Sequence, residues 1–130
     1  MSSAKSSYIR DIQQQRLYEL YKLMRQQGQY SSLCDISRSL ELMPMPIHYI
    51  STEMASWAYH QFFIHHKPVE FKSLARNILY QSFLCKCRDL RKQGLKDTHT
   101  IIQKAILSEA PCVGLSECQI RRILRAKGAK

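Results

Sequence analysis

The sequence is short of glycine, proline and acidic residues, and it has no long apolar run. Its 130 residues include 4 Gly, 4 Pro and 10 Asp+Glu, so turns are sparse and the segments between them are long. No apolar stretch approaches the roughly 20 residues that a membrane-spanning helix needs. The first seven residues lack the apolar core of a secretory leader. We therefore expect a protein of the cytoplasm with no membrane segment.

The composition fits one folded domain without covalent cross-links. A hydrophobic content of 45% excludes a disordered chain. The chain length accommodates a single core over residues 1–130 and no second core of full size. The 5 cysteines are an odd number in a chain without an export signal, which predicts reduced thiols rather than disulfides.

The hydrophobic pattern predicts an all-α fold of six helices. Apolar residues recur at three- and four-residue spacing, and no segment alternates as a strand does. Three helices are expected over about 6–27, 52–65 and 68–93, the last with Pro68 at its first position. Three shorter helices should begin after N-caps at Ser32, at Asp97 or Thr98, and at Ser116.

The same order of helix-ending and helix-capping residues occurs twice along the chain. The segment 25–28 (Arg-Gln-Gln-Gly) matches 91–94 (Arg-Lys-Gln-Gly) at an offset of 66 residues, and 46–51 aligns with 111–116 after a one-residue deletion. The order of helix, glycine, short helix, proline turn, serine cap and helix is therefore repeated. We expect two tandem three-helix units, over residues 6–66 and 67–130, of a helix-turn-helix-like kind.

The repeated proline turn resembles a known protein family. Residues 45–51 (Met-Pro-Ile-His-Tyr-Ile-Ser) and 110–116 (Ala-Pro-Cys-Val-Gly-Leu-Ser) are similar to the twice-occurring Ala-Pro-x-Phe-Tyr-(Ile/Val)-Ser segment of a family of short, basic, uncharacterised bacterial proteins. Here His48 replaces the phenylalanine, and the second copy lacks both aromatic residues. The resemblance implies a helical architecture and carries no function.

Positive charge is concentrated late in the sequence. Residues 1–65 hold 6 Lys+Arg and 5 Asp+Glu, whereas residues 66–130 hold 14 and 5. Nearly all of the formal net charge of +10 lies in the second half. Such an asymmetry indicates that one half faces a polyanion.

The end of the chain has the outline of a helix-turn-helix DNA reader. Two short helices are joined by a turn, and the second helix is basic. The start of that helix should face base edges, and the arginines after it should contact phosphates or guanines. The predicted nucleic-acid-binding residues are Lys92, Lys96, Lys104, Ser116, Gln119, Arg121, Arg122, Arg125 and Lys127.

Other interpretations of the basic half stay open. The connection over 109–115 is longer than the usual turn of such a reader. A basic helix face can be a solvated surface, and it can also meet an acidic protein, as in an adaptor or assembly component. DNA is favoured over RNA as the partner, in an accessory or regulatory role.

The third helix is rich in aromatic residues. Trp57, Tyr59, Phe62 and Phe63 cannot all share one helix face, so we expect most of them to pack against the helix over 68–93. A homodimer interface through these residues is the alternative, because aromatic residues concentrate in interface cores. Dimerisation would suit a reader of two half-sites.

The sequence contains no motif for a metal site, a cofactor or catalysis. Cys85 and Cys87 are two residues apart in a predicted helix, so their thiols diverge and cannot chelate one ion. There is no glycine-rich phosphate loop, nucleophile elbow or His-Glu-x-x-His segment. We expect a binding protein rather than an enzyme.

Overall fold

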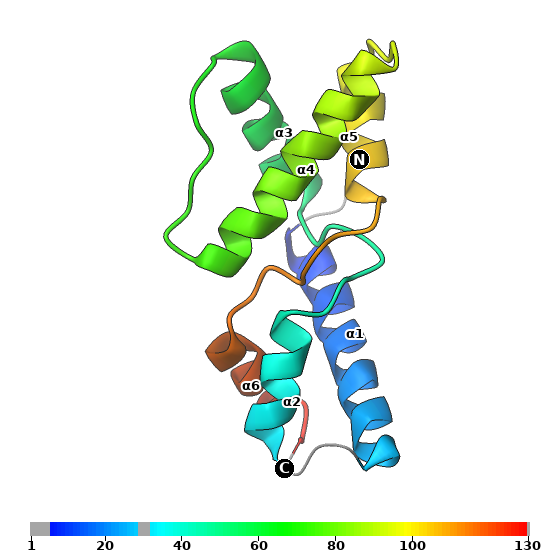
Figure 1. Cartoon of the computed structure of the whole chain (residues 1–130), viewed down its shortest axis with the longest axis vertical. Helices are drawn as coiled ribbons and strands as arrows, with labels where there is room; N and C mark the ends of the chain where they lie inside the picture. The colour runs from blue at the N-terminus through cyan, green and yellow to red at the C-terminus, as the bar shows by residue number, and fades with distance from the viewer. Residues whose placement is uncertain (1–5, 29–31, 130) are drawn as a thin grey trace.

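The computed structural model describes residues 6–28 and 32–129, and over these residues the fold is all-α, as predicted (Figure 1). The opening residues 1–5, part of the segment used to exclude a secretory leader, lie outside this range. The helices are α1 (Ser6–Gln27), α2 (Leu33–Glu41), α3 (Thr52–Tyr59), α4 (Leu74–Lys92), α5 (Thr98–Ile106) and α6 (Glu117–Ala126). A π-helical segment, η1 (His60–Ile64), continues α3 directly.

Side-chain caps start the short helices where the sequence predicts them. The Ser32 hydroxyl accepts the Asp35 N–H at 3.1 Å and so begins α2. Asp97, rather than Thr98, caps α5 by accepting the backbone N–H of Thr100. Ser116 begins α6 in a reciprocal capping box with Gln119.

The predicted start of the long helix at Pro68 is wrong, because α4 begins at Leu74 after the Ser73 cap. The preceding segment is held in a non-helical conformation by its tertiary contacts. Val69 is buried, and its carbonyl accepts the side-chain amide of Gln81 at 2.6 Å. The Phe71 N–H donates to the Asn77 side chain, so these backbone groups are satisfied from α4 rather than within a helix.

The helices form two groups that are not contiguous in the sequence (Figure 1). In one group, α6 packs on α2 and α1; in the other, α3 packs on α5 and α4. We call them the α1–α2–α6 group and the α3–α4–α5 group. The units predicted over 6–66 and 67–130 therefore exchange their third helices. The exchange arises because α6 packs on α2 and α3 packs on α5, and the linkers 42–51 and 107–116 cross between the groups instead of folding back.

The two linkers meet at a waist between the groups. The backbones of Met45 and Ala110 form an isolated antiparallel bridge, in which the Met45 N–H donates to Ala110 at 2.9 Å and the Ala110 N–H donates to Met45 at 2.8 Å. Both residues are buried. They are 65 residues apart, as are the caps Ser51 and Ser116. Linker residues thereby join the helices in one continuous hydrophobic core.

Candidate nucleic-acid interface

The predicted nucleic-acid-binding residues are divided between the two groups. Lys92 at the end of α4, Lys96 beyond it and Lys104 on α5 belong to the α3–α4–α5 group. The other six lie on α6 or at its two caps, in the α1–α2–α6 group. The helices α5 and α6, expected to pair as a helix-turn-helix, lie in different groups because the linker 107–116 crosses the waist (Figure 1).

The charge asymmetry of the sequence does not persist in space. Residues 45–109, which include the α3–α4–α5 group, hold nine Lys+Arg and five Asp+Glu. Residues 6–44 and 110–129, which include the other group, together hold the same numbers. The sequence predicts a basic second unit and a neutral first unit, but the two helix groups of the structure carry equal net charge. Net charge therefore does not identify a binding face, and the exposure of individual side chains must do so.

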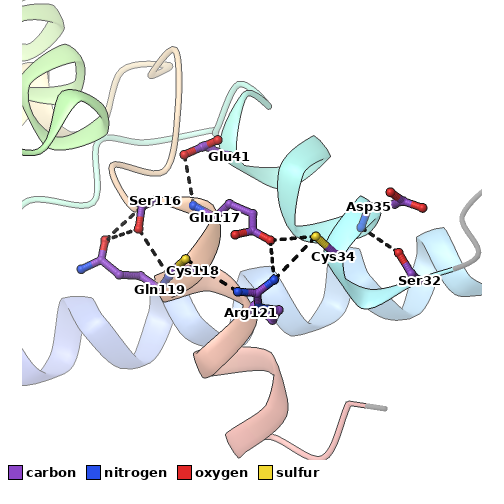
Figure 2. Close-up of polar contacts among 9 residues, drawn as sticks. All are labelled: Ser32, Cys34, Asp35, Glu41, Ser116, Glu117, Cys118, Gln119 and Arg121. Atoms are coloured by element: carbon purple, nitrogen blue, oxygen red, sulfur yellow. Dashed lines mark hydrogen bonds and ion pairs between the residues drawn. The ribbon is translucent and has the colours of Figure 1, made fainter.

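Arg121 is partly buried, and its guanidinium is engaged with side chains of α6 and α2 rather than free in solvent (Figure 2). Its guanidinium forms an ion pair with Glu117 at 2.9 Å. It also lies 3.6 Å from the Cys34 sulfur of α2 and 3.7 Å from that of Cys118. Since the Cys34 thiol donates to the same Glu117 oxygen at 3.1 Å, Arg121 fastens α6 to α2.

The carboxylate of Glu117 is stabilised in its charged form by this network. The hydrogen bond from Cys34 is the main reason that its pKa lies below the usual value, and the cations Arg121 and Arg38 act in the same direction. The Glu117 backbone N–H donates to the Glu41 side chain at 3.1 Å, which adds a second link to α2 (Figure 2). The start of α6 is therefore fixed by polar contacts.

Ser116 and Gln119, predicted to face base edges, are engaged with each other (Figure 2). The Ser116 N–H donates to the Gln119 side-chain oxygen at 2.9 Å, and the Gln119 N–H donates to the Ser116 hydroxyl at 3.4 Å. These contacts close the first turn of α6. They leave Gln119 with its amide NH₂ group for any reading of bases.

Arg122 and Arg125 form the exposed basic face of α6. Ile120 and Leu124 are fully buried on the opposite side of the helix. Arg122 and Arg125 are three residues apart, so they share one side, and both are exposed. Glu117 is the only acidic residue of α6, and it is turned toward α2. Lys127, the C-cap, is also exposed.

Most of the aromatic residues of the third helix pack against α4, as expected. Tyr59 is buried, and Phe62 and Phe63 are partly buried. The Arg91 guanidinium of α4 lies 4.7 Å from the Phe63 ring centre and donates to the Tyr59 hydroxyl at 3.1 Å. Trp57 is 45% exposed. A homodimer interface through these aromatic residues stays a prediction.

A cavity lies at the waist, and it was not predicted from the sequence. The cavity has a volume of about 340 Å³ and is lined by both linkers and by the helices α1, α4 and α6. Two arginines, Arg10 and Arg76, are among its residues. A signal was present in the sequence, because these arginines are 66 residues apart, the offset at which Arg25 matches Arg91.

No described helix meets the length and hydrophobicity needed to cross a bilayer. Within residues 6–28 and 32–129, no three His, Cys, Asp or Glu side chains are grouped so as to hold a metal ion. We compared the chain with protein-family models, curated proteins and solved structures. None of them matches. What the protein does must be inferred from its own residues and their geometry.

Proposed function

We propose that the protein binds nucleic acid, with double-stranded DNA as the favoured form, through Arg122 and Arg125 on α6. The observation that carries this proposal is the two-sided character of α6. Ile120 and Leu124 on its apolar side are fully buried, whereas its opposite side presents two arginines without an acidic neighbour on the helix. A short helix held firmly in this way can hold its cations at fixed positions along a phosphate backbone.

Binding would depend mainly on phosphate neutralisation. Each arginine that contacts a phosphate releases condensed counterions, so affinity should fall steeply with added salt. Arg121 supports this surface indirectly, since it fixes α6 to α2 through Glu117 and Cys34. Because Ser116 and Gln119 are engaged in the capping box, we expect little preference for base sequence.

The test is charge reversal on α6, compared with an equal reversal on the other group. Binding of a labelled duplex by Arg122→Glu/Arg125→Glu should be more than about tenfold weaker than wild type, and the slope of log affinity against log salt should fall by about 2. The control variant Lys92→Glu/Lys104→Glu changes the net charge equally and should retain affinity within about threefold. Fluorescence anisotropy at several salt concentrations measures both quantities.

An α6 variant that binds the duplex as tightly as wild type would exclude this face. Equal losses in both variants would assign binding to net charge rather than to α6.

The second candidate is an adaptor whose basic surface meets an acidic protein. It is favoured by the exposed side chains of Leu42, Leu74 and Ile78, which surround a cavity of about 210 Å³ between α2 and α4. Neighbouring exposed apolar residues are typical of protein contacts. Absence of duplex binding by the wild-type protein, even at low salt, would favour this function over the first.

A further inference from the structure

We propose that the cavity at the waist binds a phosphate monoester between Arg10 and Arg76. Its volume of about 340 Å³ lies within the range of small-molecule sites. Arg10 comes from α1 and Arg76 from α4, so the cavity is formed jointly by the two helix groups. Neither residue lies on α6, and the inference is independent of the proposed nucleic-acid interface.

The charge of the cavity matches a doubly charged anion. Arg10 and Arg76 are among its residues, and none of the residues that line it is acidic. A phosphate monoester carries about −1.5 to −2 charges at neutral pH. Two guanidinium groups balance this charge, and each can donate two parallel hydrogen bonds to phosphate oxygens.

Arg76 is positioned by aromatic rings. Its guanidinium carbon lies 4.4 Å from the ring centre of Phe71 and 5.6 Å from that of Tyr80. Contacts of this kind hold the guanidinium beside the rings. A side-chain hydrogen bond links Arg76 to Tyr80, which leaves the remaining N–H groups of the guanidinium for an anion. Arg10 is exposed at the start of α1, and no described residue forms an ion pair or side-chain hydrogen bond with it.

Helix N-termini add positive potential to the same cavity. Ser51 and Ser73, the N-caps of α3 and α4, line it, and Gln119 from the first turn of α6 does so too. Three helices thus begin at this cavity. The N-terminal end of a helix carries a partial positive charge and favours a bound phosphate.

The remaining walls suit an organic group rather than phosphate alone. Ile9, Ile50, Leu79 and Leu115 supply apolar surface, and the buried rings of Tyr49 and Tyr80 also line the cavity. Apolar walls with a few convergent polar groups are typical of sites for small organic ligands. The ligand class is therefore a monoester whose organic part enters the apolar region while its phosphate meets the arginines.

Isothermal titration calorimetry with AMP as the probe tests the proposal. Wild-type protein should bind AMP at least about tenfold more tightly than it binds adenosine or inorganic phosphate. Arg10→Gln and Arg76→Gln should each weaken AMP binding by about tenfold or more, as expected for a lost hydrogen bond to a charged group. Arg10→Lys should restore part of the affinity. The control Arg122→Gln removes the same charge outside the cavity and should bind AMP within about twofold of wild type.

Three outcomes would overturn the proposal: no AMP binding by the wild type at millimolar concentration, equal binding of inorganic phosphate, or an Arg122→Gln loss as large as that of Arg10→Gln. Because Arg10 is exposed, its variant tests the site without disturbing the packing of Phe71 and Tyr80. Competition of AMP with a 5′-phosphorylated oligonucleotide, and not with its unphosphorylated form, would identify a strand end as a source of the monoester.

Discussion

His48 is a buried imidazole with hydrogen-bond partners on both ring nitrogens. Its Nδ1 lies 3.0 Å from the Ser108 carbonyl oxygen, and its Nε2 lies 2.9 Å from the Ser82 hydroxyl. The carbonyl can only accept, so Nδ1 carries the proton and Nε2 accepts from Ser82 in the neutral ring. The residue joins the first linker to α4 and to the end of α5.

We predict that His48 makes the fold less stable as the solution becomes mildly acidic. Burial lowers the pKa of His48 below its ordinary value of 6.5, and the hydrogen bond to Ser108 offsets this only in part. Protonation therefore favours the unfolded chain. The contribution is fully present above the unfolded pKa and is lost as pH falls below about 6.5. Urea unfolding at several pH values between about 7.5 and 5 measures this loss.

The variant His48→Gln provides the control. Its side chain is polar but does not titrate, so it should be less stable at neutral pH and show a smaller change of stability over this range. Asp97 and Glu117 do not account for the change, because the pKa of each is lowered from a starting value of 3.8 or 4.5. A slope in the variant equal to that of wild type would contradict the assignment to His48.

At the scale of elements, the sequence predicts helix starts well where the signal is local. Ser32 and Ser116 cap their helices as expected, because a cap needs only a hydroxyl and the backbone of the next turn. Ser73 is missed, because the non-helical segment before it depends on burial of Val69 and a hydrogen bond from Gln81. Such contacts join residues of different elements and have no local pattern.

In the candidate interface too, the sequence predicts local features and misses contacts between different helices. Exposure of Arg122 and Arg125 follows from the helical period and agrees with the sequence prediction. The ion pair of Arg121 with Glu117 is also local, at i and i+4, but the contact of both residues with Cys34 depends on the packing of α6 on α2. The role of Arg121 as an internal link was therefore outside the reach of the sequence.

We predict that Ser116→Ala lowers the free energy of unfolding by about 1 kcal/mol, because it removes the side-chain part of the capping box of α6. Chemical denaturation measures the change. Ser116→Asp is the matched control, since a carboxylate accepts the same backbone N–H and suits the positive end of the helix. An alanine variant as stable as wild type, or an aspartate variant as unstable as alanine, would show that the cap does not stabilise α6.

At the scale of the whole molecule, the exchange of third helices could not be predicted from the sequence. The repeated helix-ending and helix-capping residues are compatible with a linker that folds back onto its own unit and with one that crosses to the other unit. The choice depends on which apolar faces meet, and it is visible only in the packing of α6 on α2 and of α3 on α5.

We predict that the fragments 1–66 and 67–130 do not fold when each is alone, and that they fold when they are mixed. In the first fragment α3 has lost α4 and α5, and in the second α6 has lost α1 and α2. Each fragment alone should show weak helical circular dichroism and no cooperative thermal transition. An equimolar mixture should regain both signals and elute as a one-to-one complex. Cooperative unfolding of either fragment on its own would contradict the exchanged arrangement.

The bridge between Met45 and Ala110 is similar to the contact that two subunits make at the axis of a symmetric dimer. In a symmetric dimer, a residue pairs with its own copy only where it lies on the rotation axis. Met45 and Ala110 pair in this reciprocal way at the offset of the predicted repeat. The bridge is thus a reciprocal contact of the kind that joins the subunits of an isologous dimer, made here within one chain. The covalent connection fixes the effective concentration of each half around the other, so the contact survives any dilution of the protein.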